Sequence, residues 1–134
     1  MKDRLENIKA TLAEAAKWNK MGKVEFPFAR RAVEAAIAGI KTFPKDLAPT
    51  ITGKEETGGK EMDTAEVSGE WKNGAEFTIG ANFERKSVKL SVDAHFRSKG
   101  GRYKHKGFEG SGAKAKHFGA QAAAWVQQMI QAVG

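Results

Sequence analysis

The chain has 134 residues, of which 40% are hydrophobic and 29% charged, a composition that indicates a globular domain rather than a disordered chain. It contains no cysteine, which excludes disulfides and thiolate metal sites and is consistent with a reducing cytoplasm. The formal net charge is +7. No run approaches the roughly 18 apolar residues of a membrane span, so we expect no membrane-spanning segment. The length predicts one domain covering residues 1–134, which we expect in the cytoplasm.

The first predicted element is a helix over residues 3–17, which neither proline nor glycine interrupts. Charges run through this segment and it lacks the apolar core of a secretory signal, so we expect no signal peptide. Asn19 and Gly22 are the expected stop of the helix. The apolar residues that recur at helical spacing are Leu5, Ile8, Leu12 and Ala16.

A second helix is predicted to start near Pro27 and to end at Pro44. Proline suits a first helical position because the N–H that it lacks has no partner there. Residues 45–63, which follow, are rich in glycine, threonine and charge, so they are either a mobile loop or a hairpin that turns at Gly58 and Gly59. The apolar face of the second helix consists of Ala32, Val33, Ala36, Ile37 and Ile40.

Two strands are predicted next, over residues 65–71 and 75–83. A two-residue Asn-Gly turn between them would place their apolar faces on opposite sides of the sheet. A three-residue loop that ends at Gly74 instead pairs Gly69 with Phe77, and the apolar faces then coincide. The register therefore predicts the longer loop, with its glycine in the left-handed conformation.

A third strand over residues 88–97 is the clearest, because apolar and polar residues alternate strictly. A basic loop over residues 98–112 follows, with an extension of the sheet around Tyr103 as an alternative. The last element is a helix over residues 113–132. Together these elements predict an α+β fold: two N-terminal helices, a three- or four-stranded antiparallel sheet and one long C-terminal helix packed on the sheet, with the helices on one sheet face.

The positive charge is concentrated between residues 84 and 117. This window holds ten lysines and arginines against three acids, so it accounts for the whole formal charge of +7. All three histidines, His95, His105 and His117, lie in it as well. Charge so polarised attracts anions over a Debye length of roughly 10 Å. The window therefore predicts a binding surface for an anionic partner, with a solvated surface kept for solubility as the alternative.

Nucleic acid is the anion that these residue types suit best. Lysine and arginine replace the counterions condensed on phosphates, glycines let a sugar-phosphate chain approach the backbone, and aromatic rings stack on bases. We therefore predict a small, basic, non-enzymatic nucleic-acid-binding protein without metal or cofactor, with DNA or RNA and single or double strand left open. The expected contact residues are Lys89, His95, Arg97, Lys99, Arg102, Tyr103, Lys104, Lys106, Lys114 and Lys116.

The stretch SGAKAKHFGAQAAA, from Ser111, resembles the end of a double-stranded RNA-binding domain, a family with an α-β-β-β-α fold. The resemblance implies that Lys114 and Lys116 contact phosphates. Gly112 and Ala113 replace two lysines of the family pattern, and the family's Gly-Pro-x-His loop is absent, so we do not assign the chain to this family. The residues in step with the pattern are Ala115, Lys116, Gly119, Ala120 and Ala123.

Asp93, His95 and Arg97 are predicted to share one face of the third strand. An aspartate that orients a histidine base beside a phosphate-binding arginine suits a nuclease or a phosphotransfer enzyme, so an enzyme is a less favoured alternative to a surface ion pair. A zinc site formed by His95, His105 and His117 is weaker still, because their spacings match no common motif.

A protein partner is the main alternative to nucleic acid. A basic surface also suits an acidic protein, as an accessory protein, a phage-type inhibitor or an assembly or virion component would use it. The last helix could in addition join copies of the chain in a homo-oligomer, because burying glutamine costs less than burying a charge. The glutamines on the outer side of that helix are Gln121, Gln127, Gln128 and Gln131.

Overall fold

The structure is a computed structural model that describes residues 17–133. The strands in this range are β1 (Trp18–Gly22), β2 (Thr50–Gly58), β3 (Met62–Glu70), β4 (Glu76–Glu84), β5 (Lys89–Arg97) and β6 (Tyr103–Ser111). The helices are α2 (Phe28–Ile40) and α3 (Ala115–Val133), with short 3-10 helices η1 (Lys45–Leu47) and η2 (Gly112–Lys114).

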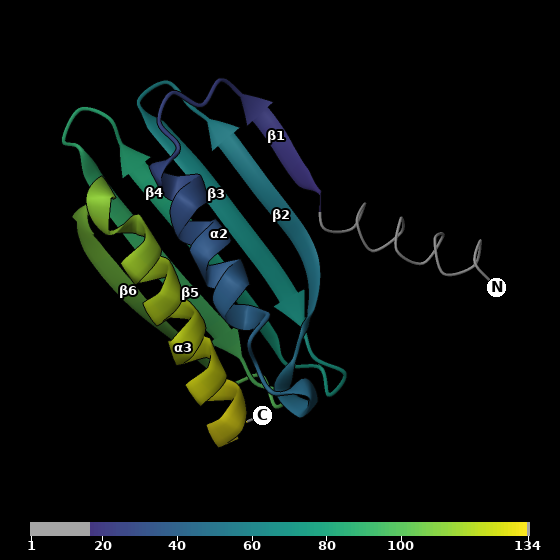
Figure 1. Ribbon diagram of the computed structural model, residues 1–134. Helices are drawn as coiled ribbons and strands as arrows, with labels where there is room; N and C mark the ends of the chain where they lie inside the picture. Colours follow the sequence, from purple (N-terminus) through teal and green to yellow (C-terminus); the bar gives the residue numbers. More distant parts are fainter. Residues whose placement is uncertain (1–16, 134) are drawn as a thin grey trace.

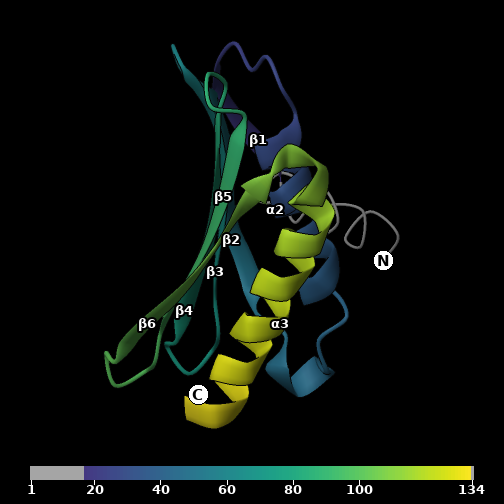
Figure 2. The same ribbon diagram turned by 90° about the vertical axis from the view of Figure 1, so that its left-hand side faces the viewer.

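The strands form one mixed sheet in the order β1-β2-β3-β4-β5-β6. β1 lies parallel to β2, and each later strand is antiparallel to the one before it. Figure 1 shows α2 and α3 side by side on one face of this sheet. Seen edge-on in Figure 2, the opposite face is covered by no helix of the described range. We call the first the helix face and the second the open face.

The predicted element count is wrong, although the α+β class and the single helix-covered face hold. The described residues have one N-terminal helix, α2, and six strands of mixed direction, instead of two such helices and a three- or four-stranded antiparallel sheet. The helix expected over residues 3–17 lies, except for Lys17, outside the described residues. Its expected stop, between Asn19 and Gly22, is part of β1. β1 escaped prediction because only Trp18 is partly buried, so no alternation marks it, and it becomes a strand by pairing with β2.

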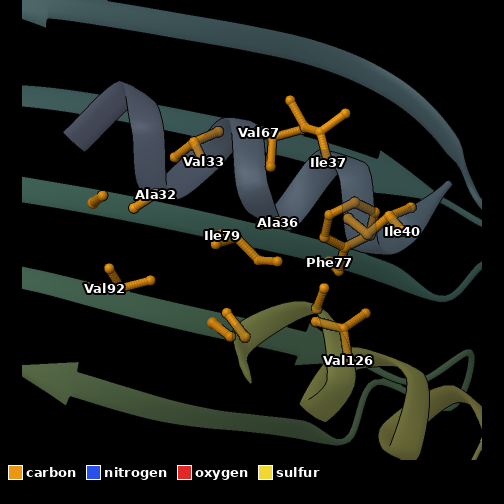
Figure 3. Packing of buried hydrophobic residues seen from close by; sticks show 14 of the residues in the cluster. Ala32, Val33, Ala36, Ile37, Ile40, Val67, Phe77, Ile79, Val92 and Val126 are labelled. Carbon is orange, nitrogen blue, oxygen red and sulfur yellow. The ribbon is translucent and has the colours of Figure 1, made fainter. Parts of the chain in front are cut away.

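The core lies between the sheet and the two helices. α2 follows Pro27, as predicted, and turns its apolar side to the sheet. Figure 3 shows these side chains, with Val126 of α3, pointing at apolar residues of three strands. The strand residues labelled there are Val67, Phe77, Ile79 and Val92. The buried residues of α2 are Ala29, Ala32, Val33, Ala36, Ile37 and Ile40.

α2 and α3 approach each other closely because small residues meet where they cross. A Cβ added to Gly119 would lie 2.0 Å from the Ala32 carbonyl oxygen, and one added to Gly39 would lie 2.8 Å from the Cβ of Ala123. A larger residue at either glycine would have to push the helices apart. Neither these helices nor any other in residues 17–133 is long and apolar enough to cross a membrane.

The turn between β3 and β4 confirms the predicted register. Gly69 pairs with Phe77, and Gly74 has a φ of 95°. The Trp71 N–H donates to the Ala75 carbonyl at 2.9 Å and closes the three-residue loop. The alternation predicted for β5 is confirmed too, since its apolar side chains are buried on the helix face.

Residues 45–63, which the sequence analysis leaves between a mobile loop and a hairpin at Gly58 and Gly59, contain η1, β2 and the start of β3, and β2 and β3 form a hairpin. The Gly59 N–H donates to the Met62 carbonyl at 2.8 Å across its turn. Gly58 lies against the chain that leaves β1, because a Cβ there would be 2.0 Å from the Lys23 backbone. Glycine at this position therefore lets the β1–α2 link cross over β2.

Most of the predicted 98–112 loop is strand β6, so the loop prediction is wrong over that part and the sheet extends well beyond Tyr103. The helix-face positions of β6 include Lys104 and Lys106, which pair with Phe96 and Ala94 of β5. Both lysines are exposed. β6 therefore shows no alternation of apolar and polar residues, which is the signal by which strands are predicted.

Candidate nucleic-acid interface

The tight turn at residues 98–102 presents two cations at the end of the β5–β6 hairpin. The Ser98 N–H donates to the Arg102 carbonyl at 2.8 Å, and the Arg102 N–H donates to the Ser98 hydroxyl at 3.0 Å. Gly101, with a φ of 85°, takes the left-handed conformation that the turn requires. Ser98 is buried, whereas Lys99 and Arg102 are exposed and line an open hollow of about 440 Å³ with Ser98 and Gly100.

Three rings lie together on the open face beside this turn, and we call them the ring ladder: His95, Tyr103 and His105. Their centroids are 5.7 Å apart for His95 and Tyr103, 5.9 Å for the two histidines, and 6.1 Å for Tyr103 and His105. The interplanar angles are 24° to 30°, so the rings are close to parallel. Tyr103 is 54% exposed, and its hydroxyl shares a hydrogen bond with Nδ1 of His95. A shallow hollow of about 100 Å³, lined in part by Thr78 and Arg97, adjoins the ladder.

Lys104 and Lys106 lie on the other face of β6, the face that carries the helices. The Lys106 ammonium is 5.9 Å from the centroid of the Phe108 ring, which stacks in turn on Phe118 of α3. Both lysines sit on an edge strand, so their long side chains can reach solvent past the edge of the sheet. Lysines at such positions also discourage pairing with the same edge of another copy of the chain, because the like charges repel.

The cations at this end of the hairpin are free of acidic partners in the described range. Lys99, Arg102, Lys104 and Lys106 make no ion pair with residues 17–133. Lys89, by contrast, lies at the far end of β5 and pairs with Glu109 at 3.2 Å. An unpaired cation can neutralise a phosphate without giving up a protein partner.

Lys114 and Lys116 do not join this group. They follow β6 in η2 and α3, whereas the β5–β6 turn precedes it, so the two groups lie at opposite ends of the nine-residue strand (Figure 2). At about 3.3 Å per residue, roughly 30 Å separates them. The structure therefore divides the ten predicted contact residues into a hairpin group, the paired Lys89 and a helix-start group.

The centre of the open face is acidic, which the sequence analysis missed. Seven carboxylates of β2–β6 point to that face, against the cations Lys89 and Arg97. A hollow of about 330 Å³ lies there over Gly80, lined among others by Glu66 and Asp93. Burial and the charge of neighbouring Glu55 raise the pKa of Glu66. Alternation within β2 and β3 would have revealed these carboxylates once the strands were assigned.

Asp93, His95 and Arg97 share the open face as predicted. In the described range, however, His95 is hydrogen-bonded through Nδ1 to Tyr103, and no hydrogen bond joins it to Asp93. His117 lies on α3, apart from the other two histidines. Residues 17–133 contain no group of three His, Cys, Asp or Glu side chains placed to hold a metal ion.

A second cationic groove on the helix face was also missed by the sequence analysis. It has a volume of about 390 Å³ and lies between α2 and the first two strands. Arg30 and Lys54 both contact the Trp18 ring, with the guanidinium 4.8 Å and the ammonium 5.2 Å from its centroid. Burial, then the charges of Lys41 and Arg30, lower the pKa of Lys54. Arg30 forms ion pairs with Glu34 and Glu56, so its charge is less available to an anionic ligand than the unpaired charges at the hairpin end.

The hairpin end thus combines a tight turn, near-parallel rings on the open face and unpaired lysines on the helix face of the same edge strand. Comparison of the chain with protein-family models, curated proteins and solved structures found no match.

Proposed function

We propose that this protein is a small, non-enzymatic, cytoplasmic nucleic-acid-binding protein. Its contact region is the hairpin surface, which we define as Arg97, Lys99, Arg102, Tyr103, Lys104 and Lys106. The observation that carries the proposal is the placement of unpaired cations around exposed aromatic rings at the end of one hairpin. Cations alone would suit any anion, whereas rings beside them suit a ligand with both phosphates and bases.

The binding we propose is weakly sequence-selective. The hairpin surface is made of strand and turn residues, so the contact we propose does not place a helix in a major groove. Contacts with phosphates fix position but carry no sequence information. Affinity should therefore depend strongly on salt and only modestly on base order.

The test is fluorescence anisotropy with labelled DNA and RNA oligonucleotides at about 50 and 200 mM salt. The variant is Lys104→Glu/Lys106→Glu, and the matched control is Lys20→Glu/Lys60→Glu, which makes the same charge change at exposed positions on β1 and the β2–β3 turn. We expect the wild type and the control to bind, with affinity falling about tenfold or more between the two salt concentrations.

The hairpin variant should lose most of this binding while circular dichroism shows an unchanged fold. Equal losses in the hairpin variant and the control would show that only total charge matters, and the hairpin surface would not be the site. Absence of salt-sensitive binding by the wild type would reject nucleic acid as the ligand.

A protein partner is the second candidate, and the free edge of β6 favours it. β6 is the last strand of the sheet, so its outer backbone groups have no strand partner in residues 17–133. An acidic extended segment could add to this edge with its carboxylates near Lys104 and Lys106. Hydrogen exchange with an oligoglutamate peptide tests this, because strand addition should slow the exchange of β6 amides. Unchanged exchange at saturating peptide would reject this mode.

A further inference from the structure

We propose that the hairpin surface binds single-stranded rather than duplex nucleic acid, with bases stacked on the ring ladder and the backbone running along the outer edge of β6. This inference rests on the proposed function and names its substrate class. It is carried by the ring geometry, by the position of the rings on the face that no helix of the described range covers, and by the acidic centre of the same face.

The positions of the three rings of the ladder follow from the pairing of β5 with β6. His95 and His105 are direct cross-strand partners, and Tyr103 lies two residues before His105 on the same face. With centroids 5.7 to 6.1 Å apart, the rings contact one another and leave no room for a base between them. Bases therefore stack on the outer surface of the ladder. Every base has such a π-face, so stacking tolerates any sequence.

A duplex cannot use this surface. Its base faces are covered by neighbouring pairs, and proteins that read RNA bases on a sheet take unpaired nucleotides and stack them on aromatic side chains. The ladder sits on the open face, which no helix of the described range overhangs, so an unpaired strand can reach it directly (Figure 2). The shallow hollow beside Thr78 and Arg97 gives one base edge a place to lie.

Charge determines on which side of the ladder the phosphates run. Toward the sheet centre lie Glu66 and Asp93, which repel phosphates. Toward the turn and the edge lie Arg102, Lys104 and Lys106, which are exposed and unpaired in the described range. The bound nucleic-acid strand must therefore keep its sugar-phosphate backbone along the outer edge of β6, while its bases reach inward over the rings of the ladder.

The test compares a labelled single strand of about 12 nucleotides with its own duplex, at about 50 mM salt and in both DNA and RNA forms. Tyr103→Ala removes the exposed ring, Tyr103→Phe keeps the ring without its hydroxyl, and Ser91→Ala is a control on the same face of β5, away from the ladder and its hollow. We expect the single strand to bind about tenfold or more tightly than the duplex. Tyr103→Ala should weaken single-strand binding by a similar factor, and the other two variants by less than about twofold.

The outcomes separate this inference from the proposed function. Salt-sensitive binding of single strand and duplex with equal affinity, unaffected by Tyr103→Ala but lost in Lys104→Glu/Lys106→Glu, would overturn the inference and leave the proposed function standing. Failure of the wild type to bind either form would overturn both. Equal weakening by Tyr103→Ala and Tyr103→Phe would show that the hydroxyl acts rather than the ring, and would also overturn the inference.

Discussion

Asp63 is a buried charge at the start of β3, 1% exposed, that joins three segments of the chain. Both its carboxylate oxygens accept hydrogen bonds from Arg85, at 2.5 and 3.2 Å. The N–H groups of Glu25 and Phe26 donate to the same carboxylate at 3.2 and 3.0 Å. This one side chain therefore anchors the link between β1 and α2 to the end of β4, an arrangement typical of a satisfied buried charge.

Asp63→Asn should destabilise the fold by about 3 kcal/mol, because it removes one partner of a buried, hydrogen-bonded ion pair and leaves Arg85 only the exposed Glu25 carboxylate, 3.8 Å away, as a counter-charge. Urea unfolding followed by circular dichroism measures this change. Glu61→Gln, at an exposed turn position nearby, is the control and should change stability by less than about 0.5 kcal/mol. A loss as small as that of the control would show that the pair is not a structural anchor.

The lowered pKa of Asp63 also leads us to expect a loss of stability in acid. Burial opposes its ionisation, but hydrogen bonds from Arg85, Phe26 and Glu25 outweigh burial and hold the pKa of Asp63 below its ordinary value. A lowered pKa means that the stabilisation is complete above the unfolded value of about 4 and disappears as the pH falls through the folded value. As the pH falls below about 4, the wild type should therefore lose stability more steeply than Asp63→Asn. Parallel curves from acid titrations of the two proteins would contradict this.

At the scale of elements, the fold depends on the close contact between α2 and α3. Gly119→Ala should destabilise the protein by about 1 to 3 kcal/mol, because the new methyl group would meet the Ala32 carbonyl. Alanine favours helices over glycine, so any destabilisation must come from this clash. Gly53→Ala is the control, since nothing lies within 4 Å of a Cβ added there. Thermal unfolding that gives Gly119→Ala a stability equal to or above the wild type would show that the helices can separate freely.

The strands differ in how clearly the local sequence pattern predicts them. β3, β4 and β5 alternate on a sheet with one covered face, so their register followed from keeping Val67, Ile79 and the other apolar residues on one side. β1 and β6 lie at the two edges of the sheet, where little or nothing covers their side chains. Where neither face of a strand is buried, apolar and polar residues do not alternate. The sequence therefore predicts a loop at Lys104 and Lys106, although both are strand residues.

At the scale of the whole molecule, the two basic groups at opposite ends of β6 should act separately. Lys99→Glu/Arg102→Glu should weaken the binding of a single strand of about four nucleotides, too short to span β6, about tenfold or more and reduce the salt slope by about 1.4, the value for two lost contacts. Lys114→Glu/Lys116→Glu should have a much smaller effect, because about 30 Å is several Debye lengths at physiological salt. Equal losses in anisotropy titrations would instead indicate one continuous surface along the strand.

This separation also bears on the resemblance to a double-stranded RNA-binding domain. The resemblance implies that Lys114 and Lys116 contact phosphates, whereas the ring ladder and the unpaired cations lie at the other end of β6. The same pair of variants therefore discriminates between the two: loss of binding in Lys114→Glu/Lys116→Glu alone would favour the helix start as the site.

The sequence by itself determined the properties that depend on neighbours along the chain: the helix after Pro27, the register between Gly69 and Phe77, the polar face of β5 and the concentration of charge near the end. Each follows from local periodicity or from local composition. Periodicity reports which side of an element is buried, and composition reports where charge is concentrated. Only the tertiary structure decided that β1 is a strand, that the basic window divides into two distant groups, and that carboxylates from five neighbouring strands gather on the open face. These features arise from pairing between distant segments, and hydrogen bonds between strands leave no pattern in the residues that they join.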